Sequence, residues 1–118
     1  MTDLERVRPW LEGALEYSGG THIWQDIVDN VVTGKMQLWF GEKSSAITEI
    51  LCYPRKKVLH VFLAGGDMNE LIDMIEDASN WGRAQGCNAI TMSGRKGWQR
   101  VLDKDEWLLT SVTMGKEL

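Results

Sequence analysis

The chain has 118 residues, with 17 acidic and 13 basic side chains and a formal net charge of −4. This length suits one domain around a single core, covering residues 1–118, and leaves no room for a separate substrate domain. The acidic balance gives no general attraction to phosphate backbones, so we expect no nucleic-acid partner.

The cysteines and the apolar segments indicate the cellular compartment of the protein. Cys52 and Cys87 stand far apart without CxxC spacing or histidine partners, so we expect reduced core residues, no disulfide and no metal site. The sequence has no leader-like start and no uninterrupted apolar run of about 18 residues. These features predict a cytoplasmic protein that is neither exported nor inserted in a membrane.

Two amphipathic helices are predicted before any strand. Residues 4–17 repeat apolar side chains at helical spacing, and Asp3 can cap the start of this helix. The segment Ser18-Gly19-Gly20 should end it. Thr21 is then expected to cap a second, shorter helix, which Gly34 closes.

From Met36 onward, apolar residues alternate with polar ones, and this alternation predicts strands. Residues 36–40, 46–53 and 57–63 form three of them. The turns between these strands are short, so the strands should pair as an antiparallel three-stranded meander.

The second half of the chain predicts a crossover unit. A long helix is expected over residues 68–85, followed by a strand at 88–93 that lies parallel to the preceding strand, because a helical crossover joins them. A short helix at 95–103 and a C-terminal strand at 107–114 complete the chain. The predicted fold class is therefore α/β of the α+β kind, with a mixed, mainly antiparallel sheet and helices on both faces.

This succession of elements resembles the GNAT superfamily of N-acetyltransferases over nearly the whole chain. The segment Asn80–Cys87 is similar to the end of the long GNAT helix, where a small residue precedes a terminating glycine by four positions. The segment Gly94–Leu102, followed by Trp107, is similar to a phrase of small phage and prophage proteins of GNAT type. The resemblance implies a GNAT-like fold and a phage or prophage origin.

The resemblance also implies where acetyl-CoA would bind. GNAT enzymes hold its pyrophosphate on backbone N–H groups of an Arg/Gln-x-x-Gly-x-Gly/Ala loop at the start of the long helix. Here the basic position of that loop falls at Gly66, and its glycine positions fall at Asp67, Asn69 and Leu71. Only Gly65 and Gly66 remain as candidate cofactor-binding residues, and no Lys or Arg stands near them.

The same stretch fits an ordinary helix start. Asp67 can cap the helix and Glu70 suits its positive end, whereas both carboxylates would repel a pyrophosphate. We therefore expect that the protein binds no cofactor.

Three residues are candidates for acid or base chemistry. The resemblance puts Leu102 where GNAT enzymes carry a tyrosine general acid, so that acid is missing. His60 and Glu49, on predicted central strands, are candidates for a general base, and Tyr53 for an unconventional acid. His60 alternates with apolar residues, which fits a hydrogen-bonded core or edge histidine better than a catalytic one.

Two surfaces are candidates for binding a partner. Arg95, Lys96, Trp98 and Arg100 form the one concentrated basic patch. In a short helix, Trp98 would face the core while the three cations face solvent, where they suit an acidic protein surface. Trp39 lies on the polar face of its strand and is a candidate for an exposed anchor that contacts a partner or a second subunit.

These observations predict a catalytically degenerate GNAT-like phage or prophage protein that acts by binding a phage structural protein or a host protein. The resemblance implies a role in virion assembly or as an internal virion component, located in the host cytoplasm or the virion; a homo-oligomer is compatible with this role. The alternative is a divergent acetyl-CoA-dependent N-acyltransferase, with Gly65 and Gly66 as N–H donors and His60 or Glu49 as base. A third hypothesis is a small phage regulator that inhibits a host protein.

One geometric feature separates these hypotheses. An acyltransferase needs the strand ending at Leu63 and the strand starting at Asn88 to diverge into an open V that admits the cofactor. Side chains that close this V exclude the cofactor.

Overall fold

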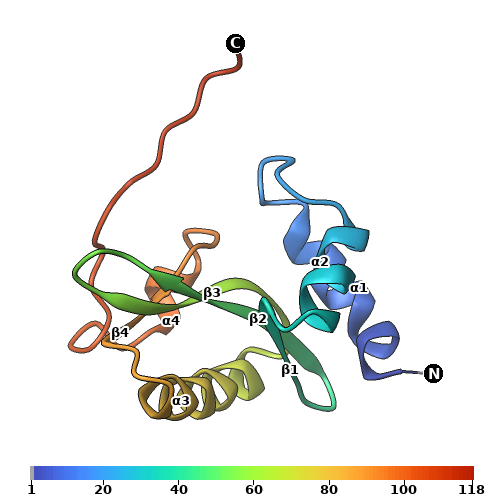
Figure 1. Cartoon of the computed structure of the whole chain (residues 1–118), viewed down its shortest axis with the longest axis horizontal. Coiled ribbons are helices and arrows are strands. Elements are labelled where there is room, and N and C mark those ends of the chain that lie inside the picture. The colour runs from blue at the N-terminus through green and yellow to red at the C-terminus, as the bar shows by residue number, and fades with distance from the viewer. Residues whose placement is uncertain (1) are drawn as a thin grey trace.

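The computed structural model describes residues 2–118, in which a four-stranded sheet has helices on both of its faces (Figure 1). The strands are β1 (Met36–Phe40), β2 (Ser44–Cys52), β3 (Lys57–Gly66) and β4 (Ala89–Met92), and they lie side by side in that order. β1 pairs with β2 and β2 with β3 in antiparallel fashion, whereas β4 runs parallel to β3. The predicted meander and parallel crossover strand are confirmed.

Four helices surround this sheet. α1 (Asp3–Leu15) and α2 (Trp24–Val32) precede it, α3 (Met68–Ala84) connects β3 to β4, and α4 (Trp98–Val101) follows β4. In Figure 1, α3 runs along one side of the sheet, while α1 and α2 gather at the blue N-terminal end. No helix within residues 2–118 is long and apolar enough to cross a membrane.

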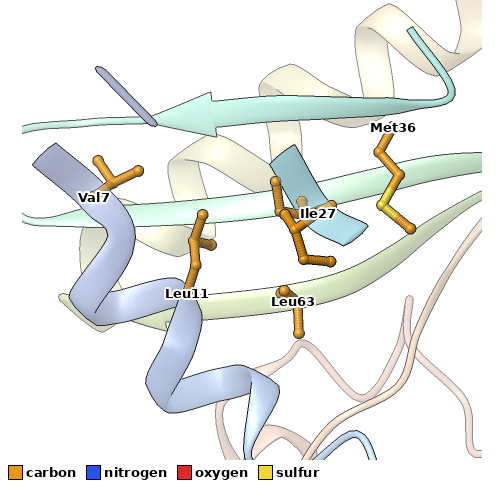
Figure 2. Packing of buried hydrophobic residues seen from close by; sticks show 6 residues of the cluster. Val7, Leu11, Ile27, Met36 and Leu63 are labelled. Carbon is orange, nitrogen blue, oxygen red and sulfur yellow. The ribbon is translucent and has the colours of Figure 1, made fainter. Parts of the chain in front are cut away.

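The larger core cluster, here called the α1/α2 cluster, joins the first two helices to the sheet. Its buried members are Val7, Leu11, Ile27, Met36, Ile47 and Leu63. Figure 2 shows the side chains of Val7 and Leu11 reaching from α1 toward the strands, with Ile27 of α2 beside them. The spacing of four residues puts Val7 and Leu11 on one helical stripe, so both can be buried against the same sheet face.

A second cluster, here called the α3 cluster, lies between the sheet and α3. It consists of Ala46, Leu71 and Met74. Neighbouring residues of a strand point to opposite faces, so Ala46 contacts this cluster while Ile47 contacts the α1/α2 cluster. The expectation of helices on both faces of the sheet is confirmed.

β3 contains an irregularity in its pairing with β2. Ile47 pairs with Leu63 and Thr48 with Val61, so Phe62 between them has no partner on β2. This bulge lets two consecutive residues, Phe62 and Leu63, both pack against the α1/α2 cluster.

The caps of the first two helices differ from the predictions. Thr2 rather than Asp3 caps α1, because its hydroxyl accepts the N–H of Glu5 and the Glu5 carboxylate accepts the N–H of Thr2. Thr21 does not cap α2, because its hydroxyl donates to the Ser18 carbonyl instead. Both predicted helices nevertheless form.

The C-terminal part of the chain differs most from the predictions. α4 is shorter than the helix predicted at 95–103, and residues 107–114, predicted as a strand, run extended without pairing (Figure 1). A segment with the sequence pattern of a strand forms one only when it pairs with another strand. Here the N–H groups of Glu106 and Trp107 donate to the Asp103 carbonyl, and the chain leaves this turn away from the sheet.

The burial of α2 gives a direct test of this fold. Ile27→Ala should lower the free energy of unfolding by about 2–5 kcal/mol, because it removes fully buried methyl groups and leaves a cavity. Val32→Ala on the same helix should change it by less than about 0.5 kcal/mol, because Val32 is 77% exposed. Urea unfolding followed by tryptophan fluorescence measures both variants, and equal losses would contradict this orientation of α2.

Candidate functional site

A row of polar side chains crosses the three strands β2, β3 and β4. Glu49 is the register partner of His60, and His60 is the register partner of Thr91. Cross-strand partners point to the same face of a sheet. The structure therefore brings together His60 and Glu49, the two candidate bases, and adds Thr91 beside them.

This row lies on the sheet face opposite α3. Leu59 and Val61, which flank His60, lie next to α3 residues, including Gly82 in the case of Leu59. His60 must therefore point to the other face, which it shares with Phe62 of the α1/α2 cluster.

His60 makes hydrogen bonds through both ring nitrogens. Its Nδ1 lies 2.7 Å from Thr91 Oγ1, and its Nε2 lies 3.1 Å from the hydroxyl oxygen of Ser93. A neutral imidazole has one N–H donor and one acceptor, so a single tautomer satisfies both contacts. Burial lowers the pKa of His60 below its ordinary value of 6.5, and the nearby Glu49 carboxylate offsets part of this shift. His60 is therefore neutral at pH 7 and can accept a proton.

Aromatic contacts border the polar row. The ring centroids of His22 and Phe62 lie 4.7 Å apart, and the Arg95 guanidinium lies 4.6 Å from the centroid of the Tyr17 ring. These contacts tie the α1–α2 loop to β3 and to the loop after β4. The Ser93 residue remains exposed next to the neutral histidine ring.

The arrangement of His60 and Ser93 is that of a general base beside a hydroxyl group. Thr91 and Ser93 were not predicted as site residues. Their approach to His60 depends on the parallel register of β3 and β4, which is a contact between distant segments. The sequence indicated only that residues 88–93 form a strand beside the strand that carries His60.

Tyr53 lies outside this row. It stands at the β2–β3 turn, where its N–H donates to the Lys56 carbonyl, and its side chain is 58% exposed. Within the described part of the chain, no hydrogen bond links it to His60 or Glu49. The structure therefore does not bring this candidate acid to the candidate bases.

Gly65 and Gly66 are explained by close backbone contacts. A Cβ atom on Gly65 would lie 2.5 Å from the carbonyl oxygen of Trp10 in α1. Gly66 has a φ of +112°, and a Cβ atom there would collide with the carbonyl of Lys43 in the β1–β2 turn. These glycines let α1 and the turn approach the end of β3, so their presence needs no ligand.

The start of α3 is occupied by its own carboxylates. Asp67 caps the helix by accepting the N–H of Glu70 at 3.0 Å, and its own N–H donates to the Lys43 carbonyl at 2.9 Å. The Glu70 carboxylate accepts the N–H of Lys43 at 3.1 Å and the hydroxyl of Ser44. Negative charge therefore already sits at the positive end of the helix.

The pairing of β3 with β4 ends at Val61. The N–H of Ser93 donates to the Val61 carbonyl at 3.3 Å, and beyond this point β3 continues to Gly66 paired with β2 but not with β4. Trp98 of α4 packs against the α3 cluster, as Ala64 of β3 does. The indole therefore lies on the same face of the sheet as α3.

Trp39 is not an exposed anchor, so this expectation was wrong. Its Nε1–H donates to Thr48 Oγ1 at 2.9 Å, and its ring meets that of Trp81 in α3 edge-on, with 5.9 Å between centroids. The residue is half-buried. The polar face of β1 is the face that α3 covers, which the alternation within β1 could not reveal.

In the basic patch, the cations and the tryptophan differ in exposure, as the short-helix interpretation predicted. Arg95, Lys96 and Arg100 are exposed, whereas Trp98 is half-buried against the α3 cluster. The three cations are therefore accessible to a partner, and the indole belongs to the fold.

The thiols and acidic groups form no evident metal centre. Cys52 is exposed at the end of β2, unlike the core residue that we expected, and Cys87 is half-buried; both are free. Within residues 2–118, no group of three or more His, Cys, Asp or Glu side chains is arranged to hold a metal ion.

Comparison with known proteins identifies the class of fold. No protein-family model and no curated protein sequence matches the chain. Solved structures do match: a tetramutant of the BH1408 protein from Bacillus halodurans has a TM-score of 0.64 and 12% identity, over 97% of this chain and 88% of that chain. A probable acetyltransferase has a TM-score of 0.63 and 11% identity, over 97% of this chain and 93% of that chain. The chain shares the fold of these structures, which agrees with the GNAT-like fold that the order of its elements predicted.

The histidine of the polar row should make stability depend on pH. The lowered pKa of folded His60 means that the unfolded chain binds more protons between that pKa and 6.5. Stability should therefore fall as the pH drops below 6.5 and should level off below the folded pKa. His60→Gln should lack this part of the slope when urea midpoints of both proteins are measured around pH 6.5.

An NMR titration of the His60 ring provides the direct check. Glu49→Gln should lower the pKa of His60 further, because it removes the charge that favours the imidazolium form. A wild-type pKa at or above 6.5 would contradict this description of the site.

Proposed function

We propose that this GNAT-like domain has lost acetyl-CoA chemistry and acts by binding another protein. The observation that carries the proposal is the occupied start of α3. A helix start binds pyrophosphate through free backbone N–H groups and its positive dipole. Here Asp67 takes up the N–H of Glu70, and both carboxylates lie where the pyrophosphate would have to bind. A pyrophosphate would have to displace them against charge repulsion.

The opposite end of the cofactor path supports the same proposal. An acyl donor bound on the α3 face of the sheet would compete for space with Trp98, which packs against the α3 cluster there. Leu102, at the end of α4, stands where the resemblance puts the tyrosine that protonates the leaving thiolate. A leucine side chain has no proton to give.

The exposed cations provide a surface for a protein partner. Arg95, Lys96 and Arg100 form a local positive area on a chain of net charge −4. Such an area attracts and orients an acidic surface. Because the segment Gly94–Leu102 resembles phage and prophage proteins, we assign the protein to virion assembly or to the interior of the virion, with a phage structural protein as its partner.

Calorimetry with acetyl-CoA tests the loss of the cofactor site. The wild-type protein should bind more weakly than about 1 mM, which corresponds to less than about 4 kcal/mol of binding free energy. The matched variant Asp67→Asn/Glu70→Gln keeps the shape of the helix start and removes its negative charge. Any binding gained by this variant would identify the carboxylates as the obstacle, whereas micromolar binding by the wild type would overturn the proposal.

The polar row favours a second candidate, a divergent acetyl-CoA-dependent N-acyltransferase. Its specific support is the neutral ring of His60, which can accept the proton of an acceptor amine. This candidate requires release of free thiol from acetyl-CoA in the presence of an amine, with loss of that activity in His60→Gln. Thiol release at the rate of the protein-free mixture would exclude it.

The assignment to the virion predicts that the protein occurs in purified phage particles. Mass spectrometry of the particles should detect it, and Arg95→Glu/Lys96→Glu/Arg100→Glu should reduce its amount at least tenfold. Lys35→Glu, an exposed residue outside the patch, should leave the amount unchanged. Absence of the wild-type protein from particles, together with its recovery on a host protein, would favour the third hypothesis of a regulator that inhibits a host protein.

A further inference from the structure

The outer side of β4 is an open sheet edge. β4 pairs with β3 on one side, and within residues 2–118 no strand pairs with its other side. All four of its residues are half-buried, whereas β2 and β3 contain fully buried stretches. An open edge presents unpaired backbone N–H and C=O groups, which are a template for another strand.

A hollow lies next to this edge, on the side of α3. It has a volume of about 130 Å³, and its lining includes Ser79 and Gly82 of α3 and Ala89 and Ile90 of β4. Alternate side chains of a strand point to the same face of a sheet. A strand added to β4 would therefore direct every second side chain to the face of the sheet on which this hollow lies.

The C-terminal segment has the sequence of such a strand. Residues 107–114 carry no charge and are rich in β-branched and large apolar residues. Leu108, Leu109, Val112 and Met114 are 76%, 70%, 73% and 89% exposed. Apolar side chains that are this exposed gain stability from burial against a partner.

A turn sets the direction in which this segment leaves the domain. The Asp103 side chain accepts the N–H of Asp105 at 2.9 Å, and its carbonyl accepts the N–H groups of Glu106 and Trp107 at 3.1 and 2.7 Å. Beyond this turn the red C-terminal segment in Figure 1 runs away from the rest of the chain. The apolar side chains of this segment therefore stay exposed in the single chain.

We propose that two copies of this chain exchange their C-terminal segments, so that residues 107–114 of each copy pair with β4 of the other. Each copy has both a strand-like segment and an open edge. In a reciprocal exchange each open edge gains a strand, and the assembly is a closed dimer with two-fold symmetry. No charge repulsion between the two strands opposes this pairing, because neither residues 107–114 nor residues 88–93 contain a charged side chain. This dimer is independent of whether the domain binds acetyl-CoA.

Light scattering on the full chain after gel filtration tests the exchange. The wild type should have the mass of a dimer, and Ser111→Pro/Val112→Pro should shift the dissociation constant at least tenfold toward monomer. Adjacent N–H groups point to opposite sides of a strand, so one of these two prolines must remove a donor that faces β4. The control Lys116→Pro/Glu117→Pro lies in the same segment beyond the pairing residues and should remain dimeric.

Two further measurements distinguish exchange from other arrangements. A tagged Ser111→Pro/Val112→Pro chain keeps its open edge and should retain the untagged wild type on a column. Hydrogen exchange at the amides of Ala89 and Thr91, which face away from β3, should slow as the wild-type concentration rises. A monomer at all concentrations, a dimer unaffected by the two prolines, or slow exchange of these amides in a monomer would each overturn the proposal.

Discussion

The contact between the β3–α3 junction and the β1–β2 turn is the constraint on which the layers of this domain depend. The backbone of Lys43 accepts a hydrogen bond from Asp67 and donates one to Glu70, so a hairpin turn and a helix start are joined through one residue. The approach is possible because Gly66 has no side chain at this point. The same contact holds the carboxylate of Glu70 against the β1–β2 turn, beside the start of α3.

The polar row on the other face is a hydrogen-bonded network around His60. Thr91 and Ser93 satisfy both nitrogens of His60, and this makes a half-buried histidine tolerable in the sheet. Burial lowers the pKa of His60 and so favours the neutral ring, which is the form that a base requires. A structural polar network and the remains of an active site therefore have the same geometry, and only ligand binding separates the two interpretations.

The sequence predicted most of the fold because helical spacing and strand alternation are set by near neighbours. The proximity of Glu49 and His60 follows from the predicted hairpin, because both residues lie on it. Predictions failed where a distant segment decides the outcome: alternation identified the face of Trp39, but only the position of α3 determines that this face is covered. Residues 107–114 show the same limit, because their pattern fits a strand and cannot specify which strand accepts it.

The burial of α1 against β3 has a consequence for how the chain folds during synthesis. Val7 and Leu11 share a cluster with Leu63, which the ribosome adds much later. The first two helices therefore emerge with their apolar stripes uncovered and stay so until β3 is complete. Contacts between such distant positions slow folding relative to a helical bundle of similar size, and the nascent chain remains a substrate for chaperones in that interval.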